Sequence, residues 1–132
     1  MKEPVWFDRT DCLAIHEAML AQHGGLSGVR DENMLESALA KPQHNFAYGK
    51  RDLADLAAAY AAGIVLNHPF IDGNKRTGFM TAMAFLEFNG HEFAATEVEA
   101  VLQTLALAAG ALDEKGYAAW LRQNSRRPGR RR

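Results

Sequence analysis

The sequence has almost no cysteine and no long apolar run. Cys12 is the single cysteine among 132 residues, so an internal disulfide is excluded, which fits a protein of the reducing cytoplasm. The longest apolar stretch, residues 56–66, covers 11 residues, about half of what a bilayer-spanning helix needs. Near the N-terminus Asp8, Asp11 and Glu17 interrupt any apolar leader. We therefore expect a cytoplasmic chain with no secretory leader and no membrane segment.

Two common catalytic signatures are also missing. The chain has no His-Glu-x-x-His zinc pattern and no Gly-x-x-x-x-Gly-Lys-Ser/Thr phosphate loop. These absences argue against a zinc protease and against a P-loop nucleotide hydrolase. Cys12 lies within helix-like apolar spacing, so we interpret it as a small core residue rather than as a nucleophile.

Acidic residues are missing from the last eleven positions, where six of the 15 basic residues gather. These six are Arg122, Arg126, Arg127, Arg130, Arg131 and Arg132. Residues 1–121 therefore hold nine basic groups against 16 acidic ones, formally −7, within a net charge of −1. We divide the chain into a domain of residues 1–121 and a basic tail of residues 122–132, which we expect to be disordered. The alternative is that this tail contacts DNA or an acidic partner.

Apolar spacing typical of helices covers nearly the whole domain. The predicted helices span about residues 11–22, 31–40, 52–67, 74–89, 96–109 and 113–123. We expect an all-α, compact single domain of about six helices, with residues 74–89 as the central and most buried one. Residues 41–51, where Pro42 breaks the pattern, are expected to form a loop or a short hairpin. Short strands are expected near residues 5–7 and 92–93.

Residues 68–76, His-Pro-Phe-Ile-Asp-Gly-Asn-Lys-Arg, carry more reactive groups than any other part of the chain. They join two predicted helices, and the second begins near Asn74. A helix start presents unpaired N–H groups and a partial positive charge, so it favours anions. Lys75 and Arg76 add two cations to that first turn. A base, a carboxylate and an anion cradle are the parts that a phosphoryl-transfer site needs.

Several side chains of this segment have candidate roles in such a site. His68 is the candidate general base, because an imidazole takes up protons near neutral pH. Asp72 offers a hard oxygen to Mg²⁺, which usually takes one or two protein carboxylates. Gly73 lets the backbone approach an anion closely. Phe70 is interpreted as a core anchor that fixes the loop.

Simpler roles remain open for some of these residues. A histidine at a helix end often caps that helix or lies in solvent, and Asp72 could cap the helix that follows it. Lys75 and Arg76 could be solvated surface cations. Without a bound anion, however, each basic residue at an exposed helix start costs about 0.3–1 kcal/mol. That cost favours phosphate binding over the simpler interpretation.

The segment resembles the signature of the Fic/Doc family, His-x-Phe-x-(Asp/Asn/Glu)-(Gly/Ala)-Asn-(Gly/Lys)-Arg, at nine consecutive positions. Residues 24–31, 35–42 and 85–90 extend the similarity to its Doc, or death-on-curing, toxin branch. The resemblance covers roughly residues 5–121 and implies a Fic-like helical fold. It also implies a set of site residues. These are His68 as the base, Asp72 as the magnesium ligand, Gly73, Asn74, Lys75 and Arg76 as contacts of the ATP phosphates, and Phe46, Ala47 and Tyr48 of residues 41–51 as a target-docking flap.

Lys75 separates the chain from the adenylyl-transferring branch of this family. That branch has glycine at this position and a further arginine where this chain has Phe79. Doc-like enzymes share both differences, and the resemblance implies that they transfer the γ-phosphoryl group of ATP to a protein hydroxyl. The expected target is elongation factor Tu, whose modification would arrest translation. Fic-type adenylyl (nucleotidyl) transfer is the alternative, and a non-catalytic partner- or DNA-binding module is a second alternative.

An inhibitory motif of many Fic proteins, Ser/Thr-x-x-x-Glu-(Gly/Asn), occurs nowhere in this chain. A toxin without its own inhibitor implies a cognate antitoxin protein. The Doc-like pattern is a disordered antitoxin segment that folds into a groove on the toxin. Contact with DNA is expected only through the antitoxin or the basic tail.

Overall fold

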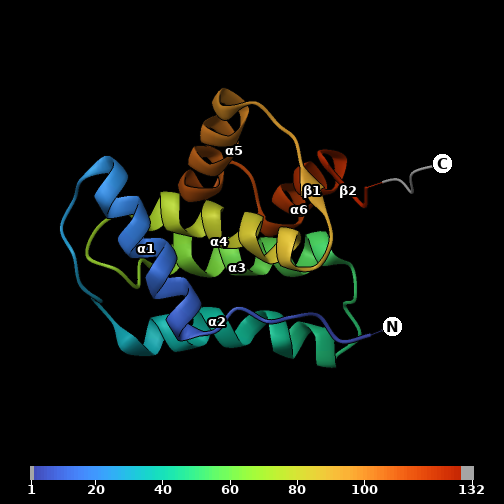
Figure 1. Ribbon diagram of the computed structural model, residues 1–132, viewed down its shortest axis with the longest axis horizontal. Coiled ribbons are helices and arrows are strands. Elements are labelled where there is room, and N and C mark those ends of the chain that lie inside the picture. The colour runs from blue at the N-terminus through green and yellow to red at the C-terminus, as the bar shows by residue number, and fades with distance from the viewer. Residues whose placement is uncertain (1, 129–132) are drawn as a thin grey trace.

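The computed structural model describes residues 2–128, which form six helices and two short strands (Figure 1). In chain order these are α1 (Arg9–His23), α2 (Glu32–Ala47), α3 (Leu53–Asn67), α4 (Asn74–Phe88), β1 (Glu92–Phe93), α5 (Glu97–Ala109), α6 (Glu114–Gln123) and β2 (Ser125–Arg126). The two strands pair antiparallel with each other. The expected all-α class is confirmed, and so is the short strand at residues 92–93.

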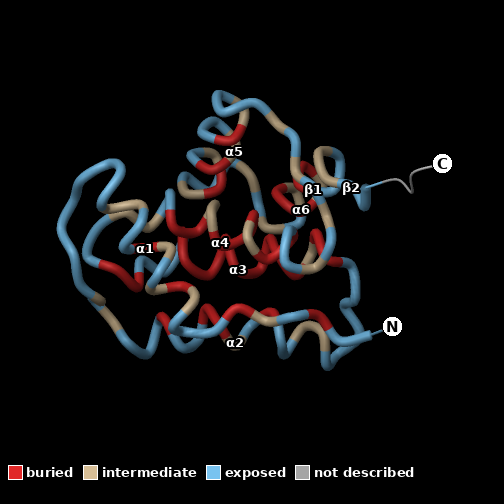
Figure 2. The backbone as a smooth tube through the Cα atoms, viewed as in Figure 1, coloured by how far each residue is buried: buried red, intermediate tan, exposed pale blue. Residues whose placement is uncertain are grey.

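Helix α3 forms the centre of the fold and contacts α2, α4, α5 and α6. Every residue of α3 up to Val65 is buried except Asp55, and Figure 2 shows the buried colour continuing along it. The prediction that residues 74–89 form the most buried helix was therefore wrong. Small side chains let the neighbours approach α3 closely from several sides, and a helix that is apolar all round is buried. At Gly63, for example, a Cβ atom would lie only 2.9 Å from the Cβ of Ala38.

Helix α2 runs through Pro42 to Ala47, so the loop or hairpin predicted for residues 41–51 was wrong over its first part. Phe46 belongs to the last helical turn, and Tyr48 forms the C-cap. The irregular connection to α3 is correspondingly short.

Packing beyond Pro42 explains why the helix continues. Proline lacks a backbone N–H, so α2 loses one hydrogen bond at this position. The ring of Phe46 lies edge-on to Trp6, with 5.6 Å between the ring centroids, and the Arg51 guanidinium lies 4.2 Å from the Phe46 centroid. Pro42 itself is buried. The contact with Trp6, which is distant in sequence, and the local contact with Arg51 offset the lost hydrogen bond.

Residues 5–7 do not form the expected strand, because two side chains occupy their backbone groups. The Tyr60 hydroxyl accepts a hydrogen bond from the Phe7 N–H at 2.9 Å and donates to the Phe7 carbonyl at 3.1 Å. The Asn89 side chain bonds the N–H and the carbonyl of Val5 at 2.7 and 3.1 Å. The N-terminal segment is thus fastened to α3 and to the end of α4.

The basic tail begins later than residue 122. Arg122 lies in α6, and its guanidinium donates to Asp52 at 2.7 Å and to Asp55 at 2.8 Å, which joins α6 to the start of α3. Ser125 and Arg126 form β2. Residues 129–132 lie outside the described part of the chain, so the disorder expected for them stays a prediction.

Cys12 is fully buried, and burial raises the pKa of its thiol to about 11. The interpretation of Cys12 as a core residue is confirmed. Between residues 2 and 128 no helix combines the length and the apolar character that a membrane crossing requires.

Candidate active site

Residues 68–73 connect α3 to α4 through two left-handed backbone positions. His68 closes α3 with a φ of 50°, and no other non-glycine residue among residues 2–128 has a positive φ. Pro69 disfavours the right-handed helical conformation at His68, so α3 ends there. Gly73, with a φ of 77°, directly precedes α4. A residue with a Cβ atom would be strained at that position.

The start of α4 has no side-chain cap, whereas an Asp or Thr side chain caps the other five helices of the described chain. The first N–H groups of a helix have no partner within it, so those of α4 face the connecting loop. No acidic residue lies in this first turn, and Lys75 and Arg76 place two cations there. This end of α4 is therefore suited to an anion.

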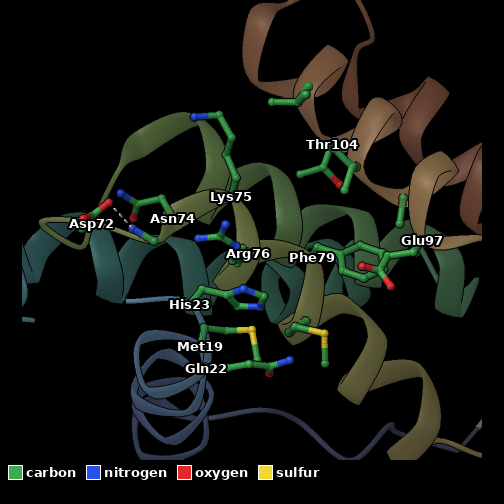
Figure 3. A pocket seen from close by; sticks show the side chains of 15 residues that line it. Met19, Gln22, His23, Asp72, Asn74, Lys75, Arg76, Phe79, Glu97 and Thr104 are labelled. Atoms are coloured by element: carbon green, nitrogen blue, oxygen red, sulfur yellow. Dashed lines mark hydrogen bonds between the residues drawn. The ribbon is translucent and has the colours of Figure 1, made fainter. Parts of the chain in front are cut away.

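The same helix end opens into a cleft of about 640 Å³ between α1, α4 and α5 (Figure 3). Predicted site residues that line it are Asp72, Gly73, Asn74, Lys75 and Arg76. Apolar side chains that line it are Met19 of α1, Phe79 and Met80 of α4, and Val101 and Leu105 of α5. A cationic edge thus meets an apolar wall, which suits a ligand with both an anionic and an apolar part.

Asp72 is held by the backbone around it. One carboxylate oxygen accepts the Gly73 N–H at 2.9 Å, and the other accepts the N–H of Leu26 at 3.2 Å. These bonds show that Asp72 does not cap α4. The imidazole of His16, buried beneath the loop, lies with Nε2 2.8 Å from the carbonyl oxygen of Asp72. Its ring also stacks on Phe70, with 3.9 Å between the centroids, which gives His16 a supporting position that sequence reasoning missed.

Asn74 lines the cleft, but both polar atoms of its side chain form hydrogen bonds within the loop. Its Oδ1 accepts the N–H of Phe70 and its Nδ2 donates to the carbonyl of Phe70, both at 3.0 Å. Phe70 is fully buried, so these two bonds satisfy backbone groups next to a core side chain. The side chain of Asn74 therefore holds the loop, and an anion at this end of α4 would meet its backbone.

His68 does not line the cleft, although it lies on the same loop and is exposed. The predicted docking residues Phe46, Ala47 and Tyr48 lie further away. They precede α3, whereas the loop follows α3, and the 15 residues of that helix span about 22 Å. Figure 1 shows the end of α2 and the 68–73 loop at opposite ends of α3. The structure thus does not bring the predicted flap to the site.

A resident metal site of several ligands is not present within residues 2–128, where no three His, Cys, Asp or Glu side chains are grouped to hold one. Two carboxylates line the cleft, that of Asp72 beside the start of α4 and that of Glu97 at the start of α5. One carboxylate suffices for Mg²⁺ that brings water and phosphate oxygens as its other ligands, so the residues fit a magnesium–nucleotide complex.

Comparisons with known proteins show the family of this chain. The model of the Fic/DOC family matches residues 6–86, which include the whole 68–76 segment. The protein named "Protein kinase doc" of Escherichia phage P1 is 35% identical over 81 residues, 61% of this chain and 64% of that protein. The protein named "Toxin Doc" of Mycolicibacterium smegmatis is 39% identical over 94 residues, 68% of each chain. This chain thus spans somewhat less than two thirds of the phage protein, and it belongs to the Fic/Doc family.

Proposed function

We propose that this protein is the toxin of a toxin–antitoxin module and transfers the γ-phosphoryl group of ATP to a hydroxyl of a translation protein, with elongation factor Tu as the expected target. The observation that carries the proposal is the uncapped, cationic start of α4 in a cleft, directly after a loop that bears His68 and Asp72. The names of the two relatives, "Protein kinase doc" and "Toxin Doc", support the kinase and toxin parts of this proposal.

In the proposed reaction, His68 accepts the proton of the target hydroxyl while the hydroxyl oxygen forms a bond to the γ-phosphorus of ATP. The bond from that phosphorus to the β,γ-bridging oxygen breaks, and ADP leaves. Lys75, Arg76 and the first N–H groups of α4 hold the phosphate oxygens and oppose their charge. The apolar wall of the cleft receives the less polar part of the nucleotide.

Magnesium would be held at Asp72, whose two oxygens are already oriented by the N–H groups of Gly73 and Leu26. When bound, the ion would neutralise phosphate charge. Because few protein ligands are present, magnesium and ATP are expected to bind together.

A transfer assay with labelled ATP tests the proposal. Purified protein is incubated with magnesium and a bacterial lysate, with the label on either the γ- or the α-phosphate. A target band labelled only from the γ-position is expected, and mass spectrometry of that band identifies the target. Label from the α-position alone would replace the proposal by adenylyl transfer. No label from either position, with a folded protein, would favour a binding module instead.

Replacing Lys75 by glycine tests how the nucleotide is oriented. Lys75 places a long cation where the adenylyl-transferring branch has glycine, so its removal is expected to lower γ-phosphoryl transfer by about 10²-fold and to let adenylate transfer appear. Lys115→Gly is the matched control, because Lys115 occupies the same second position of α6 and is exposed. Both variants are assayed with the two labels. Persistent γ-transfer at the normal rate in Lys75→Gly would contradict a role of Lys75 in orientation.

We also propose that a cognate antitoxin covers the exposed apolar side chains of α5, two of which, Val101 and Leu105, also line the cleft. Four exposed apolar side chains follow helical spacing there: Val98, Val101, Leu102 and Leu105, which are 46–69% exposed. An apolar stripe of this kind suits a partner segment that folds on binding. Its position beside the cleft would let the partner obstruct the nucleotide.

Leu102→Asp tests this contact, because Leu102 does not line the cleft. The substitution is expected to weaken antitoxin binding at least about tenfold, since it loses apolar burial and adds a charge. Calorimetric titration with the antitoxin measures the change, and transfer activity without antitoxin should be normal. Val5→Asp, at an exposed apolar position of the N-terminal segment, is the control. Equal affinities of the two variants would place the antitoxin elsewhere.

A further inference from the structure

Arg30 binds three consecutive carbonyl groups at the end of α3. Its guanidinium donates to the carbonyls of Asn67, at 2.8 Å, and His68, at 2.6 Å. Its backbone N–H donates to the carbonyl of Pro69 at 2.7 Å. Arg30, which lies 38 positions before His68 in the sequence, therefore holds the backbone of the candidate base and of the residue on each side of it.

The bonds fall where the backbone is under strain. A left-handed conformation is unfavourable for a residue with a Cβ atom, and one that precedes proline is restricted further. Such a conformation persists only where the surroundings hold it. Besides the hydrogen bond from its N–H to the carbonyl of Ile64, which ends α3, the bond from Arg30 is the one polar contact found for the His68 backbone within residues 2–128.

We propose that Arg30 is a positioning residue that fixes the backbone of His68 and thereby directs its imidazole at the target hydroxyl. The proposal rests on the proposed function of His68. Arg30 touches the carbonyl of His68 and not the reacting atoms, so its effect passes through the orientation of the base. It stands outside the 68–76 segment, and no pattern of that segment points to it.

Arginine has the geometry for this contact. The rigid guanidinium offers several donors in a fixed plane, so one side chain reaches two neighbouring carbonyls at once. The carbonyls at a helix C-terminus also carry partial negative charge, which favours a cation there. Lysine would supply the positive charge but not the planar set of N–H donors that reaches two carbonyls. Arg30→Lys is therefore expected to retain part of the function, and Arg30→Ala to lose more.

Further backbone hydrogen bonds between residues 28–31 and 69–71 hold the loop without the Arg30 side chain. The Asp31 N–H also donates to the Pro69 carbonyl at 3.1 Å, and the Ile71 N–H donates to the Gly28 carbonyl at 3.1 Å. Val29 and Phe70 form an isolated antiparallel bridge. These backbone contacts do not need the Arg30 side chain, so the loop and the cleft are expected to form in Arg30→Ala.

The test compares Arg30→Ala and Arg30→Lys with Arg9→Ala. Arg9 is also exposed and also hydrogen-bonded, through Glu32, but it does not touch the loop. In γ-phosphoryl transfer, kcat is expected to fall on the order of tenfold to a hundredfold in Arg30→Ala, less in Arg30→Lys, and not in Arg9→Ala. KM for ATP should change by less than about twofold, because the phosphate-binding start of α4 is intact. A raised KM with normal kcat would overturn the proposal in favour of a nucleotide contact.

A second readout does not depend on activity. In nitrogen–proton correlation spectra of the imidazoles, the His68 signal, assigned from His68→Asn, should shift or broaden in Arg30→Ala, while those of His44 and His91 stay in place. An unchanged His68 signal would overturn the positioning role whatever the kinetics. If the wild-type protein transfers no γ-phosphate, the proposed function fails, and the spectra still decide whether Arg30 fixes His68.

Discussion

Removing the imidazole of His68 is expected to lower phosphoryl transfer at least about 10³-fold and to abolish growth arrest. A general base contributes about 10²–10⁴ to the rate, and His68, which is exposed, carries the one imidazole of the 68–73 loop. The fold should survive, because His68 buries no side chain in the core.

The unusual backbone of His68 calls for a particular variant. Alanine would remove the base but would also sit poorly in the left-handed region, whereas asparagine tolerates that region and cannot act as a base. His68→Asn is therefore expected to match His68→Ala in its loss of transfer while the free energy of unfolding changes by less than about 0.5 kcal/mol.

The measurement combines labelled-ATP transfer with thermal unfolding and with growth of cells that express each variant. Replacement of His44, which is exposed on α2, is the histidine control and should leave transfer normal. Growth arrest that persists in His68→Asn would show that toxicity does not depend on this base, and the binding module would then become the leading function.

Local patterns in the sequence predicted most of the secondary structure. The predicted helices 31–40 and 96–109 begin with Asp31 and Thr96, residue types that commonly cap helices, and in the structure each side chain accepts a backbone N–H at its helix start. At Pro42 the local pattern gave the wrong prediction, because α2 continues through this residue. Its effect on α2 depends on Trp6, which packs on the following turn from another part of the chain, and no window around residue 42 contains that contact.

The sequence likewise predicted one part of the candidate site and missed another. The order of residues 68–76 indicated an anion site at a helix start, and the structure brings five of these residues to one cleft. Arg30 and His16 were missed as site residues, because each supports the loop from a distant segment. Residues 24–31, which include Arg30, indicated only the family resemblance, and His16 belongs to none of the stretches that carry it. Phe46 was placed wrongly for the opposite reason: a pattern assigned it to a flap, while the antiparallel course of α2 and α3 takes it to the far end of α3.

Asn74→Ala is expected to lower both stability and transfer, because the Asn74 side chain fastens the loop from within. The substitution removes two hydrogen bonds and leaves the N–H and the carbonyl of buried Phe70 without a partner. Buried unsatisfied groups cost about 1–3 kcal/mol each, and partial access of water reduces that cost. We expect the free energy of unfolding to fall by about 2 kcal/mol and transfer to fall about 10²-fold, as measured by denaturant unfolding and labelled ATP.

Two outcomes separate this role from direct phosphate binding. If the Asn74 side chain contacted phosphate, Asn74→Ala would raise KM for ATP and leave the unfolding free energy unchanged. Asn74→Asp refines the test, because a carboxylate still accepts the Phe70 N–H but repels the Phe70 carbonyl and opposes an anion at the start of α4. Asn45→Ala on α2, half-buried and away from the loop, is the control. Stability loss in both Asn74 variants but not in Asn45→Ala would show that this amide builds the site and leaves phosphate binding to the backbone of α4, Lys75 and Arg76.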